Sequence, residues 1–218
     1  NDDFDNSAFF EGMKSTLYSW HISDPVNSAE AVRSNAINAV QGNKNPFVHD
    51  TTLVRRAFFS TSAWINEFHY DNAGSDTGEF VEIVIENPNS YTLNNFKLEL
   101  YNGSNSQVYD SQTGSNFTVG SSIGNYTIYH WTPSSIQNGG PDGIALSYNS
   151  DLIQFLSYEG QITGSDGTAN GITSTDVGIS ETSSTSAGHS LYLTGTGTEY
   201  SDFNWTGPNT DSPGSINT

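Results

Sequence analysis

The spacing of apolar residues changes near residue 60, and this change sets what the chain can fold into. Before it, apolar residues recur at intervals of three and four, as on one face of an amphipathic helix. After it, residues 64–68 and 80–85 alternate apolar with polar side chains, as half-buried strands do. We therefore expect a helical segment over residues 1–60 and a mainly β domain over residues 61–218.

Two helices are expected in the first 60 residues. The first spans residues 7–22 and ends before Pro25, because proline interrupts helical hydrogen bonding. The second begins at Asn27, which forms a capping-box pattern with Glu30, and it ends near Gly42. Its apolar face consists of Ala29, Val32, Ala36, Ile37 and Val40. Two helices this short bury too little apolar surface to be stable alone, so we expect this helical hairpin to dock onto a partner surface.

The β domain is expected to be an immunoglobulin-like antiparallel β-sandwich. Short strands separated by turn residues favour two packed sheets over a parallel sheet with crossover helices, and a β-barrel is the alternative. The loop at residues 160–186 is rich in Gly, Ser and Thr, so it should lie on the surface with little regular structure. The expected strands are at residues 64–68, 80–85, 96–101, 107–109, 126–131, 143–148, 152–158 and 190–193.

Charge is divided unevenly between the two parts. Residues 1–60 carry five basic and seven acidic residues, whereas residues 61–218 carry one basic residue, Lys97, and seventeen acidic ones. Such an acidic domain should repel nucleic acid, because phosphate binding needs clustered Lys or Arg. Cysteine is absent, no apolar run approaches the ~20 residues of a membrane span, and small polar residues are abundant. We expect a protein that is extracellular or at the cell surface, with no membrane span.

Part of the first 60 residues resembles a known enzyme family. Residues 17–26, the residues Glu30, Arg33 and Asn35, and residues 41–48 are similar to the C-terminal end of secreted bacterial endonuclease I enzymes, over about residues 7–50. That family cleaves DNA and RNA at a ββα-metal site, whose general base and magnesium ligands lie upstream of this tail. The resemblance therefore implies no catalytic residue in this chain, and His21, Arg33 and Asn35 match positions that serve packing.

The β domain resembles the lamin tail domain of secreted bacterial proteins over about residues 62–217. That family has an immunoglobulin-like fold and no known catalytic residues, and it often follows secreted nucleases and hydrolases. The resemblance implies a module for binding, anchoring or assembly. The residues that carry it are 64–83, 100–103, 141–146, 155–160, 173–178, 188–203 and 212–217.

Clustered oxygen-bearing side chains predict a calcium site. Calcium takes six to eight oxygen ligands and tolerates irregular geometry. The alternative is a solvated hairpin, in which Asp and Asn favour turn conformations. Glu79 and Glu82 should face opposite sides of one strand, so only one of them can be a ligand. The candidate ligands are Asp71, Asn72, Asp76, Glu79 and Asp142, with Glu82 as the substitute for Glu79.

Two further sets of residues are candidates for binding. Asp166, Asp176 and Glu181 in the long loop could hold a second cation, although their spacing matches no known ligand pattern. Tyr101 and Tyr158, expected in exposed turns, are candidates for stacking on a glycan. The aromatic residues expected in the core are Trp64, Phe80, Phe96, Phe155 and Trp205.

These observations favour a non-catalytic extracellular module that serves surface attachment or self-assembly. Helices that dock onto a neighbouring copy would give each chain a donor and an acceptor face, and therefore a homo-oligomer or a filament. The alternative is the C-terminal portion of a secreted metal-dependent endonuclease whose catalytic residues lie upstream. A carbohydrate-binding module is a third interpretation, based on aromatic content alone.

Overall fold

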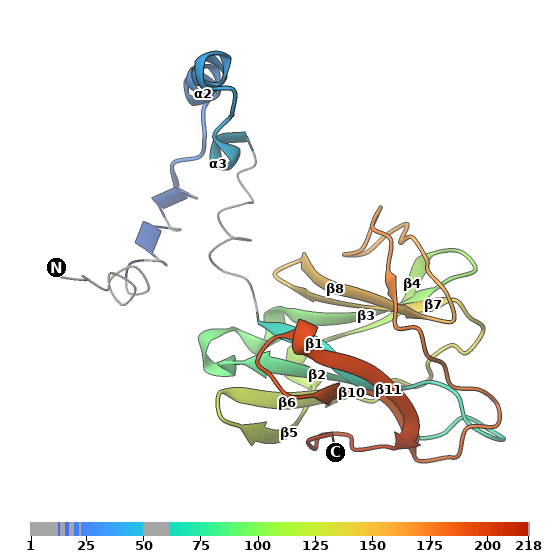
Figure 1. Cartoon of the computed structure of the whole chain (residues 1–218). Coiled ribbons are helices and arrows are strands. Elements are labelled where there is room, and N and C mark those ends of the chain that lie inside the picture. The colour runs from blue at the N-terminus through green and yellow to red at the C-terminus, as the bar shows by residue number, and fades with distance from the viewer. Residues whose placement is uncertain (1–12, 14–15, 18–19, 22, 50–61, 218) are drawn as a thin grey trace. The chain divides into compact units, whose positions relative to one another are not determined.

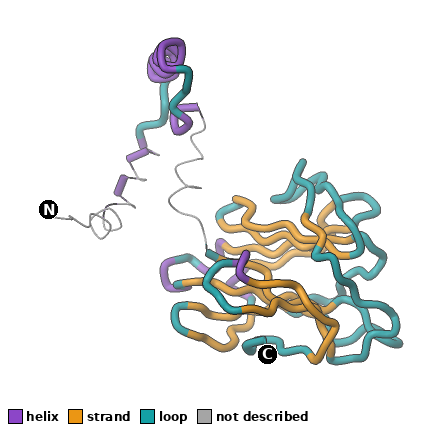
Figure 2. The backbone as a smooth tube through the Cα atoms, in the orientation of Figure 1, coloured by secondary structure: helices purple, strands orange, loops and turns teal. Residues whose placement is uncertain are grey.

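The chain divides into two compact units, Asn1–Ser60 and Thr61–Thr218 (Figure 1). A computed structural model describes residues 13, 16–17, 20–21, 23–49 and 62–217. All strands of these described residues lie in the larger unit, and the two α-helices with defined bounds lie in the smaller one (Figure 2).

The smaller unit contains helix α2 (Ser28–Gln41) and the short helix α3 (Pro46–His49). The predicted capping box is confirmed: the Asn27 side chain accepts hydrogen bonds from the first turn, and Glu30 Oε2 accepts the Asn27 N–H at 2.9 Å. Gly42 ends the helix in the left-handed conformation (φ 75°), which glycine adopts without steric cost. The predicted first helix lies mostly outside the described residues, although those described between positions 13 and 23 are helical.

Helix α2 turns a polar face toward α3. Ser34 is buried there, and its Oγ lies 3.0 Å from His49 Nε2 and 3.3 Å from the Asn45 N–H. The predicted apolar face of α2 is instead exposed: Val32 is 67% exposed and Val40 is 87% exposed. The helical hairpin therefore leaves its apolar face without a partner among the described residues of its own unit.

The larger unit is a sandwich of two β-sheets, as predicted. One sheet has six strands in the order β11-β10-β1-β2-β6-β5, and the other has five in the order β4-β3-β7-β8-β9. All pairings are antiparallel except that of β8 with β9. The strands are β1 (Ala63–His69), β2 (Phe80–Glu86), β3 (Phe96–Asn102), β4 (Gln107–Thr113), β5 (Thr118–Ile123), β6 (Tyr126–Trp131), β7 (Asp142–Tyr148), β8 (Asp151–Tyr158), β9 (Thr175–Asp176), β10 (His189–Gly195) and β11 (Phe203–Thr210). Short 3-10 helices lie at Pro88–Ser90, Leu93–Asn95, Gly114–Asn116 and Tyr200–Asp202.

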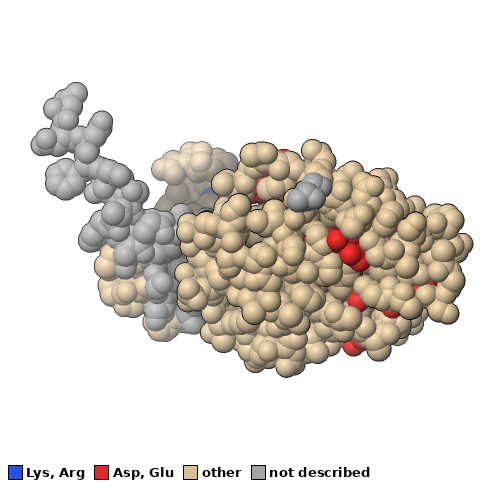
Figure 3. Space-filling view, turned by 90° about the horizontal axis from the view of Figure 1, so that it is seen from below, with Lys and Arg blue, Asp and Glu red and all other residues tan. Residues whose placement is uncertain are grey.

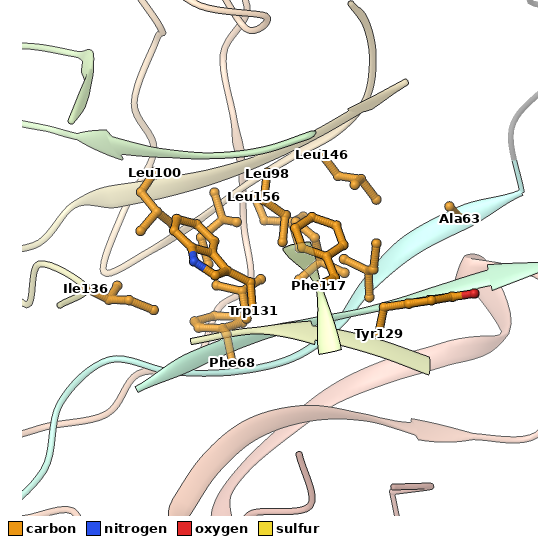
Figure 4. Packing of buried hydrophobic residues seen from close by; sticks show 14 of the residues in the cluster. Ala63, Phe68, Leu98, Leu100, Phe117, Tyr129, Trp131, Ile136, Leu146 and Leu156 are labelled. Carbon is orange, nitrogen blue, oxygen red and sulfur yellow. The ribbon is translucent and has the colours of Figure 1, made fainter. Parts of the chain in front are cut away.

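The core lies between the two sheets. Alternation along β2 sends Val81, Ile83 and Ile85 inward, and all three have no exposed surface. The facing strands contribute Leu98 and Leu100 of β3, and Figure 4 shows side chains from both sheets pointing toward one another. Trp64, Phe80, Phe96 and Phe155 are buried as predicted, and Trp205 is partly buried against the core.

Three strands were not predicted, and the long loop is more ordered than expected. β5, β9 and β11 carry small, polar or Gly-Pro sequences without clear alternation. The loop at residues 160–186 has little regular structure, as predicted, but it packs closely: Ala169 and Glu181 have no exposed surface, and Ile162 is 6% exposed. The loop therefore packs against the sandwich and buries several of its side chains. No helix among the described residues has the length and apolarity to cross a membrane.

Candidate functional site

The predicted acidic residues gather at one end of the sandwich. The segment at residues 70–79 joins the end of β1 to the start of β2, and Asp142 begins β7 at the same end. The predicted solvated hairpin is wrong for most of them: Asn72 and Asp142 are each 1% exposed, and Asp71 and Glu79 are also buried. Asp76 is the exposed member.

A buried ion pair between His69 and Glu181 organises this end. His69 Nδ1 lies 2.8 Å and 3.0 Å from the two carboxylate oxygens of Glu181, and both side chains are completely buried. The same carboxylate accepts the backbone N–H groups of Tyr70 at 2.7 Å and Asp71 at 2.9 Å. One side chain from the long loop thus fixes the backbone just after β1.

Both ring nitrogens of His69 have a hydrogen-bond partner. Nε2 lies 3.1 Å from Asn72 Oδ1, while Asn72 Nδ2 donates to the carbonyls of Ala73 and Ser75. Each ring nitrogen thus lies against an acceptor oxygen, Nε2 against the Asn72 amide and Nδ1 against the Glu181 carboxylate. Burial alone would lower the pKa of His69, but the hydrogen bond and charge of Glu181 raise it above its ordinary value. The Glu181 carboxylate therefore favours the protonated form of the His69 ring.

The other carboxylates of the acidic end each bind nearby donors. Asp76 accepts the Asn72 N–H at 3.2 Å and the Asn138 amide at 3.1 Å. Glu79 Oε1 accepts the Ile136 N–H at 3.0 Å. These bonds tie the segment after β1 to the segment before β7.

Asp142 differs from these carboxylates in one oxygen. Its Oδ1 accepts the Gly103 N–H at 2.8 Å, whereas Oδ2 is buried and has no hydrogen-bond partner among the described residues. Burial raises the pKa of Asp142 above its ordinary value, and the charge of Glu159 adds to the rise. Burial likewise raises the pKa of Asp71, with a further contribution from the charge of Asp76. Negative charge therefore accumulates at this end with little compensation.

Calcium binding at this end stays a prediction. Among the described residues, no three His, Asp or Glu side chains are grouped so that they could hold a metal ion. Glu79 and Glu82 contact different parts of the molecule, as expected for opposite directions along β2: Glu79 binds Ile136, and Glu82 binds Asn66 and Gly214. A cation could be bound by several of these carboxylates only if the backbone of residues 70–79 moved to bring them together.

The second predicted set is dispersed. Asp166 accepts the Val108 N–H at 2.8 Å, and Asp176 accepts the N–H of Gly178 two residues further on. Glu181 forms the ion pair with His69. These three acidic side chains therefore serve separate parts of the loop in the structure.

The proposed stacking role of the two tyrosines is wrong. Tyr101 and Tyr158 have no exposed surface, so neither can stack on a glycan. The Tyr158 hydroxyl donates to the Gln137 carbonyl at 2.5 Å, and the Tyr101 hydroxyl donates to the Asp166 carbonyl at 3.0 Å. Segments distant in the sequence cover both rings, residues 166–169 of the long loop at Tyr101 and Gln137 at Tyr158, which is why the sequence alone did not reveal their burial.

Two buried carboxylates lie on the outer face of the six-stranded sheet: Glu82, the substitute ligand of the predicted calcium site, and Glu67, for which the sequence suggested no role. Glu82 accepts the Asn66 amide at 2.7 Å and the Gly214 N–H at 2.6 Å. Glu67 accepts the hydroxyl of Ser190 at 2.6 Å and the backbone N–H of Ser212 at 2.8 Å. These bonds hold residues 212–217, which we call the C-terminal strap, across the sheet. Burial raises the pKa of Glu82 to about 8.

An apolar pocket lies beside the strap on the same outer face. It encloses about 360 Å³, and its floor is a separate buried cluster of Trp64, Val84, Ile128 and Leu193. Phe203 stacks on Trp64 with ring centroids 6.0 Å apart. The pocket was not predicted, because its walls come from strands far apart in the sequence.

The fold and the acidic end define the larger unit as a β-sandwich domain whose polar groups hold its loops together. Residues 2–52, in the smaller unit, match the family model of Endonuclease I. The match lies within the N-terminal part of the chain and ends before the sandwich begins. Comparison with curated proteins and with solved structures gave no significant match.

Proposed function

We propose that the β-sandwich is a non-catalytic extracellular module for surface attachment or self-assembly, joined to a segment of endonuclease I type. The observation that carries the proposal is the state of His69. A general base must reach the proton that it removes, but His69 is completely buried and both of its nitrogens are engaged, with Glu181 and with Asn72. His69 and Glu181, both completely buried, thus bind each other and are not open to a substrate.

Other candidate reactive groups support the same proposal. Ser190 follows His189 in the sequence, but its hydroxyl donates to Glu67, so no serine–histidine pair forms there. The two-sheet architecture accommodates the resemblance to the lamin tail domain, whose members are binding or anchoring modules. Secretion, which rests on composition, belongs to the same proposal.

The test is a plasmid-degradation assay on this chain with magnesium. We expect no cleavage above that of a buffer control, because the β-sandwich offers no poised base. Metal-dependent cleavage by the purified chain would contradict the non-catalytic role.

A second candidate is the C-terminal portion of a secreted metal-dependent endonuclease. The match of residues 2–52 to the Endonuclease I family favours it. In that case the helical segment completes a site made by other residues. If cleavage is observed, the double variant His21→Ala/His49→Ala decides its origin, because these are the two histidines of residues 1–60. Cleavage lost in the variant belongs to the chain, and cleavage retained at full rate points to a contaminant.

A further inference from the structure

The edges of the two sheets differ in how they are protected against association. The edge strands are β11 and β5 in one sheet, and β4 and β9 in the other. Natural sheets protect their edges with charges, proline or very short strands, because unpaired backbone groups otherwise pair with another chain. β4 carries Asp110, β9 has two residues, and β11 carries Pro208. β5 has the sequence TVGSSI, without a charge or a proline, and its one irregularity is a shift in the register with β6 between Val119 and Ser122.

β5 also exposes large apolar side chains. Val119, near the start of the strand, is 63% exposed, and Ile123, at its end, is 59% exposed. Their cross-strand partners on β6 are Tyr129 and Tyr126. Tyr129 belongs to the core between the sheets, and Tyr126 packs on the outer-face cluster, so β5 offers apolar surface on both of its faces.

The outer edge of β5 is open along most of its length. Among the described residues, one backbone hydrogen bond of β5 leads to a segment other than β6: the Ser121 N–H donates to the Gly214 carbonyl at 2.8 Å. Gly214 also donates to Glu82, whose side chain lies on the outer face of β2. The C-terminal strap therefore crosses the face of the sheet at this point and leaves its edge free.

β5 lies in an uncharged stretch of this acidic chain. The chain has a net charge of −18, but residues 111–141 contain no Asp, Glu, Lys or Arg. This uncharged stretch includes all of β5 and β6. Figure 3 views the molecule from the side on which β5 lies in Figure 1, and the acidic side chains there gather toward the right of the face. β5 and β6 themselves thus bring no carboxylate to a contact between two copies, and the carboxylates that act on Tyr126, beside Ile123, are Glu86, Glu199 and Asp202.

We propose that β5 pairs with β5 of a second copy, antiparallel and about a two-fold axis, so that two six-stranded sheets join into one. A two-fold axis makes the interface self-complementary, and an antiparallel pair of identical strands satisfies it. One strand from each copy buries little surface, so the dimer should be weak, with a Kd on the order of 100 µM. The proposal is independent of the proposed function, which names no interface on the sandwich.

The first experiment is sedimentation equilibrium of the full chain from about 10 to 500 µM, bracketing the expected Kd. We expect a monomer–dimer equilibrium that strengthens with added salt, since salt screens the repulsion between two acidic chains. Val119→Lys and Ile123→Lys should each weaken the dimer at least about tenfold, because they place a like charge at the axis. Ile172→Lys is the matched control: Ile172 is 47% exposed but lies outside β5, so its dimer should be unchanged.

The second experiment uses the absence of cysteine. Single cysteines placed in turn at positions 118–123 should form a disulfide-linked dimer most readily at the one or two positions nearest the axis, where Cα atoms approach to about 5.5 Å. Asn209→Cys on the β11 edge is the control and should not cross-link. Circular dichroism checks that each variant is folded. If a lysine variant is unfolded, the cysteine series still tests the proposed interface.

Three results would overturn the proposal. The first is a monomer across the whole concentration range. The second is a dimer that survives in both lysine variants, which would place the contact elsewhere, for example on the exposed apolar face of α2. The third is equal cross-linking at all six cysteine positions.

Discussion

At the scale of single residues, the buried carboxylates of the outer face are the most informative groups. Glu82 has no exposed surface, and its two oxygens are occupied by Asn66 and Gly214. Burial raises its pKa from 4.5 to about 8, and the charge of the nearby Glu67 contributes to the rise. Burial raises the pKa of Glu67 too. Protonation of each carboxyl is therefore more favourable in the folded chain than in the unfolded chain.

These shifts predict a fold that becomes less stable as pH rises. A carboxyl whose pKa is higher in the folded state than in the unfolded state contributes stability below the unfolded value, and the contribution disappears as pH rises through the folded value. For Glu82 the window runs from about pH 4.5 to about pH 8. Urea unfolding between pH 5 and pH 8 should show a loss on the order of 4 kcal/mol at most. His69 acts in the same direction, because its pKa is also raised.

Glu82→Gln should flatten this pH dependence, because glutamine imitates the protonated carboxyl at every pH. The variant should match or exceed the wild type near pH 8 and resemble it near pH 5. Glu86→Gln, at the far end of the same strand and partly exposed, is the control and should keep the wild-type slope. A Glu82→Gln profile parallel to that of the wild type would refute the assignment.

At the scale of elements, the C-terminal strap depends on a close approach of two glycines. A Cβ at Gly120 of β5 would lie 2.4 Å from the Gly214 carbonyl oxygen, which is too close for any side chain. The strap therefore passes over β5 with no room for a methyl group. The hydrogen bonds of Glu67, Glu82 and Asn217 then hold the strap on the sheet.

Gly120→Ala is predicted to lift the strap. We expect a loss of about 1–3 kcal/mol in unfolding free energy, because backbone must shift to admit the methyl group. Hydrogen exchange should rise at the Ser212 and Gly214 amides, which now donate to Glu67 and Glu82. Gly139→Ala is the control, since a Cβ there would meet nothing within 4 Å. Unchanged exchange at both amides would contradict this prediction.

The elements also show what the sequence could predict. β2 and β3 were recognisable because alternate residues face the core, whereas β5 and β11 lack that alternation and become strands through their neighbours. At the acidic end, the nearness of Asp71 to Glu79 along the chain was visible. The partner of His69 was not, because Glu181 lies 112 residues further on in a segment without regular structure.

At the scale of the whole molecule, the acidic end brings several buried carboxyl groups close together. The pKa of Asp71, Glu79 and Asp142 is raised, chiefly by burial, and neighbouring carboxylates add to each rise. His69 is bound to Glu181 and offsets only part of the rise at Glu79, and Lys97 pairs with Glu99 at 2.6 Å. A cation would relieve the repulsion.

Calcium is therefore predicted to stabilise the sandwich. About 1 mM calcium should raise the thermal midpoint by roughly 3–5 °C at neutral pH, and EDTA should reverse the change. The effect should fade toward pH 4, where carboxylates become protonated. Asp71→Asn should reduce the response, and Lys97→Gln, which leaves the acidic end intact, is the control. An equal thermal midpoint with calcium and with EDTA would contradict calcium binding.

The strand order also has a consequence for biosynthesis. β1, the first strand of the sandwich to be made, lies inside its sheet, and its Glu67 faces Tyr192 of β10. One side of β1 has no neighbour until β10 leaves the ribosome. The larger sheet can thus close only after nearly all of the polypeptide is available, and such non-local closure is slow. The six-stranded sheet is therefore expected to form only after synthesis has passed β10.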